Sequence, residues 1–146
     1  MTGKIVDQWR QYCRPVINPQ LSKFCTALTG INQETLDAAS TFPEVLEKFN
    51  IWLEQFGLGT SHTFALVTDG SFDVCKFLRL SCQQEGIEMP GWAEKWINIK
   101  KSFGNFYHIS NHCNLQGMLA KLNMKFLGKP HSGLDDARNI GRVLSR

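Results

Sequence analysis

Two kinds of apolar spacing alternate along this chain of 146 residues. Residues 63–68 (TFALVT) form a short, nearly continuous apolar run, which is typical of a strand covered on both faces. Residues 5–14 and 95–100 alternate between apolar and polar side chains, which predicts two more strands. Because strands alternate with helices after residue 63, we predict an α/β fold with a largely parallel sheet there.

Helical spacing fills much of the remaining chain, with apolar residues three or four positions apart. Gly30 and Gly57 are predicted to end two helices, because glycine readily adopts the left-handed backbone found there. Thr41 and Glu44 have the spacing of a capping box, which predicts a helix start. The predicted helices cover residues 21–28, 32–38, 42–56, 74–82, 115–122 and 134–144. The inward face of the fourth is predicted to be Val74, Phe77, Leu78 and Cys82.

The composition indicates one folded domain over residues 1–146, since 42% of the residues are hydrophobic. The net charge of +3 permits a polyanionic partner without requiring one. The five cysteines form no Cys-x-x-Cys pair. Cys25, Cys75 and Cys82 fall on or near apolar helix faces and are expected to be small buried thiols in a reducing compartment. A zinc site of Cys113 with His108 and His112 is an alternative, although its spacing matches no standard pattern.

The sequence gives no sign of targeting to a membrane. Its first residues lead directly into a strand-like segment, with no apolar core of a signal peptide. No apolar run approaches the roughly 18 residues that a membrane span needs. The chain is therefore expected to be intracellular, in the cytoplasm and/or the nucleus, without a membrane partner.

Three residues combine a base with carboxylates that suit a metal ion. His131 precedes Asp136 by five residues at the start of the last predicted helix, and Asp73 follows the predicted strand 63–68. Ligands of open α/β sheets bind beyond the carboxyl ends of strands, where Asp73 is expected to lie. A base and two carboxylates in such places indicate metal-dependent phosphoryl chemistry, and we expect the three side chains to share one cleft.

Each of these residues also has an ordinary structural explanation. Asp73 would interact favourably with the dipole at the N-terminus of its helix. Ser132 would cap the last helix, which would make Asp135 and Asp136 ordinary first-turn acids. His131, taken alone, would be a surface residue of a loop. These alternatives remain open on the residues themselves.

Seven stretches add a family resemblance: QYCRP at 11–15, LSKFC at 21–25, LTGI at 28–31, TDGSFD at 68–73, KWINI at 95–99, GNFY at 104–107 and HSGLDD at 131–136. In order and spacing they resemble the exonuclease domain of the enhancer-of-RNAi family, the histone-mRNA 3′-end exonucleases and their relatives. That family belongs to the DEDDh group of 3′→5′ exonucleases. The resemblance implies an RNase H-like mixed sheet flanked by helices.

The resemblance also implies roles for individual residues. Asp73 matches the metal-binding aspartate of the second exonuclease motif, and Asp136 matches the last metal-binding aspartate. His131 matches the general base, and Asp135 matches the non-catalytic neighbour of Asp136. The implied cofactor is Mg²⁺ or Mn²⁺. The implied partner is RNA, bound at its 3′ end or as structured RNA.

One part of the family pattern is missing from these residues. The first motif is an aspartate and a glutamate two positions apart on the opening strand, and no Asp-x-Glu occurs in the sequence. With Asp73 and Asp136 alone, two dications would face too few anionic ligands. The strand at 63–68 would also lose a ladder partner, so we expect an N-terminally truncated domain with an incomplete sheet. A truncated gene product, a shortened isoform and a diverged pseudo-nuclease would each explain the pattern.

Two function hypotheses follow. The first is a 3′→5′ exoribonuclease domain that hydrolyses phosphodiester bonds at RNA 3′ ends and is inactive as this isolated chain. The second is a non-catalytic RNA-binding pseudo-nuclease or truncated isoform. Lys76, Trp96 and Arg138 are candidate substrate-binding residues, because they combine positive charge or an aromatic ring with sequence positions near the matched motifs.

Overall fold

The computed structural model describes residues 3–109 and 113–146, which divide into two compact units. The smaller unit contains residues 7–64. The larger unit contains residues 65–146 and the short segment that precedes residue 7. Each unit has its own strand pair and helices. The assignment of residues 1–146 to a single, incomplete domain stays a prediction.

The smaller unit is mainly helical and follows the predicted helix ends closely. Gly30 ends its first helix with a left-handed φ of 75°, and the side chain of Asn32 caps the second by accepting the backbone N–H of Thr35 at 2.7 Å. The predicted capping box is present, because Glu44 accepts the backbone N–H of Thr41 at 2.7 Å. The elements are β1 (Cys13–Arg14), α1 (Lys23–Thr29), α2 (Gln33–Asp37), β2 (Ser40–Thr41) and α3 (Phe42–Gln55).

The predicted strand over residues 5–14 is wrong except at its end. Only β1 forms a ladder, a two-residue parallel pair with β2. Trp9 instead packs its ring against Phe49 of α3, with 5.1 Å between the ring centroids. The alternation alone therefore does not establish a strand, because a ladder also needs a partner strand elsewhere in the chain.

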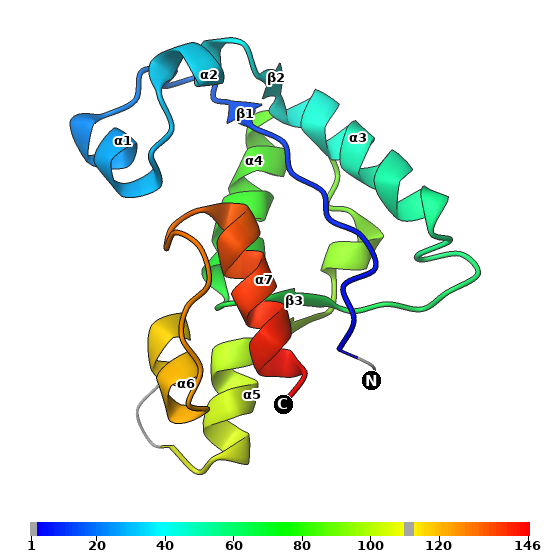
Figure 1. The fold of residues 1–146 in the computed structure, drawn as a ribbon. Helices are drawn as coiled ribbons and strands as arrows, with labels where there is room; N and C mark the ends of the chain where they lie inside the picture. The colour runs from blue at the N-terminus through cyan, green and yellow to red at the C-terminus, as the bar shows by residue number, and fades with distance from the viewer. Residues whose placement is uncertain (1–2, 110–112) are drawn as a thin grey trace. The chain divides into compact units, whose positions relative to one another are not determined.

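The larger unit carries the sequence stretches at 68–73, 95–99, 104–107 and 131–136, and Figure 1 labels most of its elements. Its two strands, β3 and β4, pair in parallel, with Leu66 opposite Trp96 and Thr68 opposite Asn98. They are shorter than the predicted strands at 63–68 and 95–100, and Ile99 already begins a helix. The elements are β3 (Leu66–Thr68), η1 (Asp73–Leu78), α4 (Arg79–Gln84), η2 (Gly91–Ala93), β4 (Trp96–Asn98), α5 (Ile99–Phe106), α6 (Leu115–Lys121) and α7 (Gly133–Leu144).

The sheet is incomplete within the part of the chain that the structure describes. There β3 has β4 as its single strand neighbour, and the β1–β2 ladder is a separate pair. This agrees with the expected unpaired edge on the strand that ends at Thr68. Both ladders are parallel, so the described residues do not form the antiparallel part of a mixed sheet.

The helix after β3 begins with a π-helical segment, η1, which changes the side that faces the core. Val74 and Cys82 are buried as predicted, but Phe77 is 58% exposed. A π-helix closes its hydrogen bonds over five residues and therefore turns less per residue than an α-helix. The α-helical spacing consequently assigned Phe77 to the wrong face.

The core of the larger unit lies between α5, α6 and α7. Met118 and Leu119 of α6 are almost fully buried, and they cluster with Phe103 of α5 and Val143 of α7. Val67 of β3 packs against this cluster. Helix α7 contacts both β3 and α6, so it belongs to the same packed core as the strand.

Candidate active site

A pocket of ≈ 580 Å³ in the larger unit is lined by the end of β3 and the beginning of α7. Asp73, His131 and Asp136 all line this pocket. The structure therefore brings together the three residues to which the sequence assigned chemistry. They come from two segments that are more than fifty positions apart in the sequence.

Asp73 enters the pocket from the turn that follows β3. It is the first residue of η1, and the preceding turn is closed by the Thr68 hydroxyl, which donates to the carbonyl of Gly70. The side chain is exposed in the first turn of the helical segment, where the helix dipole favours a negative charge. The structural explanation of Asp73 and its place in the pocket are thus compatible.

His131 lies in the turn that leads into α7. Its backbone has a left-handed φ of 65°, which is uncommon for a residue with a side chain. The side chain is exposed, and the backbone N–H donates to the Asp136 carboxylate. An exposed imidazole beside this pocket is able to accept a proton from a water molecule.

The surroundings of Asp136 shift the pKa of its carboxyl group. Burial raises its pKa above the usual range, against the hydrogen bond from the His131 backbone and the charge of the His131 side chain. The negative charges of Asp69 and Asp135 raise this pKa further. Carboxyl groups with a shifted pKa in a cleft are candidates for functional sites.

The raised pKa determines how Asp136 affects stability. A carboxyl group whose folded-state pKa exceeds its unfolded value binds its proton more tightly in the folded state. Its ionisation therefore disfavours folding, and stability falls as pH rises from about 4, the ordinary aspartate pKa, through the folded value. Below that window both states are protonated, so Asp136 no longer disfavours folding.

The pocket holds an ion pair that the sequence analysis did not identify. Lys100 Nζ lies 2.6 Å from Asp69 Oδ2, and both residues line the pocket. The other oxygen of Asp69 is buried and lacks a hydrogen-bond partner among the described residues. Asp69 directly follows β3, so the rule that placed Asp73 at the strand end also pointed to Asp69.

The three candidate substrate-binding residues lie outside the lining of this pocket, and their roles stay predictions. Lys76 Nζ lies 5.6 Å from the centroid of the Phe72 ring, which does line the pocket. Trp96 is partly buried in β4, where its indole nitrogen has no partner among the described residues. Arg138 forms an ion pair with Asp135 at 3.2 Å.

The described donors do not form a complete metal site. No group of three or more His, Cys, Asp or Glu side chains in residues 3–109 and 113–146 could hold a metal ion. Asp73 and Asp136 are hard oxygen donors of the kind that Mg²⁺ and Mn²⁺ take, but two carboxylates leave most of the coordination sphere to water. The alternative zinc site includes His112, which lies outside the described residues.

The comparison with protein families agrees with the resemblance that the sequence motifs indicated. The chain belongs to the Exonuclease family, whose profile matches residues 1–144.

Among its relatives, 3′-5′ exoribonuclease 1 of Homo sapiens is 49% identical over 99% of this chain. The chain spans 42% of the length of that relative. ERI1 exoribonuclease 3 of Homo sapiens is 33% identical over 98% of the chain, which spans 43% of it. Both comparisons relate these residues to part of a longer exoribonuclease.

Solved structures match the fold closely. The nuclease domain of 3′hExo, a DEDDh family member bound to rAMP, superposes with a TM-score of 0.93 at 50% identity, covering 97% of this chain and 71% of that one. A 3′-exonuclease in a structure of specific recognition of the histone mRNA stem-loop gives a TM-score of 0.94 at 48% identity. That match covers 98% of this chain and 64% of the other. The chain therefore has the α/β fold of the RNase H-like DEDDh exonucleases.

No helix among the described residues is long and apolar enough to cross a membrane.

Proposed function

We propose that these residues belong to a 3′→5′ exoribonuclease domain that hydrolyses RNA from its 3′ end. The observation that supports this proposal is the convergence of Asp73, His131 and Asp136 on one pocket. The raised pKa of Asp136 adds a functional signature at the same place. Because the relatives named above are exoribonucleases, we propose RNA 3′ ends as the substrate class.

In this proposal His131 is the general base that takes a proton from the attacking water. Asp73 and Asp136 are the carboxylates available for Mg²⁺ or Mn²⁺, the ions on which DEDDh exonucleases generally depend. Because no described group of three donors could hold a metal, we assign no metal-dependent step to the 146 residues alone. We therefore propose that the isolated chain does not degrade RNA at a useful rate.

The test compares two proteins on the same 5′-labelled RNA, as a single strand and as a stem-loop, with Mg²⁺ or Mn²⁺. The first is the 146-residue chain, for which we expect no shortening. The second is the same chain extended by a strand that carries aspartate-x-glutamate, for which we expect shortening from the 3′ end. Asp136→Asn in the extended protein should abolish this shortening, because it removes an anionic ligand.

Two results would contradict parts of the proposal. If the 146-residue chain shortens RNA and Asp136→Asn abolishes this, the proposed inactivity is wrong. If the extended protein folds but remains inert, the catalytic proposal fails.

The second candidate function is then the non-catalytic binder. The incomplete set of metal-binding donors favours this candidate. In such a binder the pocket, with the Lys100 side chain, would be part of an RNA-binding surface. Fluorescence anisotropy with the same RNAs would measure RNA binding by the chain directly. Binding that weakens steeply with salt is expected, because Lys100 and other cations would release counterions from phosphate.

A further inference from the structure

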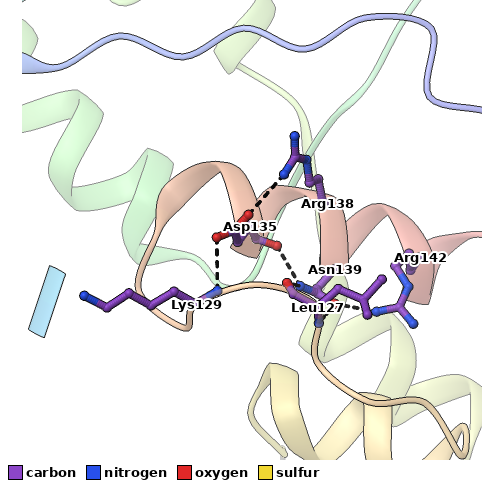
Figure 2. Close-up of polar contacts among 6 residues, drawn as sticks. All are labelled: Leu127, Lys129, Asp135, Arg138, Asn139 and Arg142. Atoms are coloured by element: carbon purple, nitrogen blue, oxygen red, sulfur yellow. Dashed lines mark hydrogen bonds and ion pairs between the residues drawn. The ribbon is translucent and has the colours of Figure 1, made fainter. Parts of the chain in front are cut away.

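The segment that carries His131 is attached to α7 by two side chains of that helix. This segment, residues 127–132, is called the His131 loop below. Figure 2 shows Asp135 and Asn139 of α7 with their polar contacts to Leu127 and Lys129. Both contacted residues precede His131 in the loop, and its other end enters α7 directly.

Asn139 holds the beginning of the loop. Its side chain is 0% exposed. A buried asparagine needs hydrogen-bond partners for its amide group, and here the loop supplies them. The amide oxygen accepts the backbone N–H of Leu127 at 3.1 Å, and the amide nitrogen donates to the Leu127 carbonyl at 2.9 Å. The nitrogen also donates to the carbonyl of Asp135 at 2.7 Å, which keeps the amide plane in one orientation.

Asp135 holds the middle of the loop. Its carboxylate accepts the backbone N–H of Lys129 at 3.0 Å, two residues before His131. This hydrogen bond is the main reason why the pKa of Asp135 lies below its usual range. Gly128 lets the backbone pass this close, because a Cβ at that position would lie 2.5 Å from the Asp135 carboxyl carbon.

The His131 backbone needs such support. A left-handed φ in a residue with a side chain costs on the order of 1 kcal/mol or more and persists where the surroundings determine it. The contacts of Asp135 and Asn139 limit the paths by which the chain can reach α7. The same geometry aims the His131 backbone N–H at Asp136, beside the pocket.

We propose that Asp135 and Asn139 are positioning residues, which fix the His131 loop and thereby place His131 beside Asp136 for catalysis. This inference rests on the proposed function for its catalytic meaning. Neither residue lines the pocket, so each acts through the loop and not on the substrate.

The first experiment measures backbone amide hydrogen exchange by NMR in the 146-residue chain. In Asp135→Ala we expect the Lys129 amide to exchange about tenfold faster or more, the factor for losing a hydrogen bond to a charged group. The His131 amide should also exchange faster, because the loop that holds its bond to Asp136 is released. Asp135→Asn keeps an oxygen acceptor for Lys129 and should restore exchange to within about threefold of the original rate. Asn139→Ala should affect the Leu127 and His131 amides together.

The matched control is Asn32→Ala, which also removes a side-chain acceptor from a backbone N–H, in the smaller unit. It should speed exchange at Thr35 and leave His131 unchanged. If Asp135→Ala leaves the His131 amide unchanged, the inference is overturned. It is also overturned if all amides of the larger unit speed up equally, because the effect is then general stability. Should Asn139→Ala not fold, the partly exposed Asp135 variants still decide the question.

The second experiment measures RNA hydrolysis by the extended protein that carries aspartate-x-glutamate. Asp135→Ala should lower kcat about tenfold or more with little change in KM, because a misplaced base slows the chemical step. Asp135→Asn should restore most of kcat. A raised KM with unchanged kcat would overturn the positioning role. If the extended protein is itself inert, the proposed function fails, and the exchange data alone still support or reject the attachment of the loop.

Discussion

Replacement of Asn139 by alanine should cost the larger unit about 2–3 kcal/mol in its free energy of unfolding. The side chain makes three hydrogen bonds to backbone groups of Leu127 and Asp135. At about 1 kcal/mol each, these bonds contribute about 3 kcal/mol. Alanine has a higher helix propensity than asparagine, which returns about 0.5 kcal/mol. The net loss is a large fraction of the roughly 5–15 kcal/mol that stabilises an ordinary domain.

Urea unfolding at neutral pH, followed by circular dichroism and tryptophan fluorescence, would measure this loss as a lower midpoint with an unchanged slope. Asn105→Ala is the matched control, since Asn105 is exposed on α5 and its replacement changes little beyond helix propensity. We expect that control to be neutral or slightly stabilising. If the two variants differ by less than about 0.5 kcal/mol, the Leu127 backbone recovers its hydrogen bonds from water, and the energetic argument for Asn139 is refuted.

Three further predictions concern neighbouring groups. Gly128→Ala should lower the melting temperature, because a Cβ there collides with the Asp135 carboxylate and φ is +87°, and the double variant with Asp135→Ala should recover only part of the loss. An unchanged melting temperature would contradict this. Asp136→Asn should raise the urea midpoint at neutral pH, and this gain should vanish below about pH 4, the ordinary aspartate pKa. A gain that persists at pH 3 would show that ionisation is not its cause. Calorimetric titration of the 146-residue chain with Mg²⁺ should give no saturable binding below millimolar concentration, and a saturating site would contradict the incomplete donor set.

Local signals were sufficient for the helix ends of the smaller unit. The capping box of Thr41 and Glu44 and the left-handed Gly30 are determined by residues within one or two turns, so their patterns predict structure directly. The segment 5–14 was misassigned for the opposite reason. A ladder depends on a partner elsewhere in the chain, and the alternation around Trp9 does not reveal that its partner is a helix.

The candidate site was predictable where each residue adjoins an element end. Asp73 follows β3 and Asp136 lies in the first turn of α7, so the sequence pattern and the family resemblance both pointed to them. Asn139 was not identified, because an asparagine in a helix ordinarily belongs to the solvent-facing side. In retrospect Asp135, Asn139 and Arg142 share one face at spacings of four and three residues. Arg142 donates to the Asn139 amide oxygen at 2.6 Å, which makes that face a polar network and not a solvated surface.

Residues at the pocket disfavour folding, and the contacts that hold the neighbouring loop favour it. Ionised Asp136 and the left-handed His131 both work against folding, the first through burial of charge and the second through backbone strain. The contacts of Asp135 and Asn139 stabilise the backbone of Leu127 and Lys129, which precede His131 in the loop, and neither side chain lines the pocket. This division is expected where a functional arrangement is locally unfavourable, because the compensating bonds must act on the same backbone without occupying the space that a substrate needs. The buried Asn139 is bonded to the loop that carries the exposed His131, and its burial is therefore better explained by the demands of the site than by the packing of α7 alone.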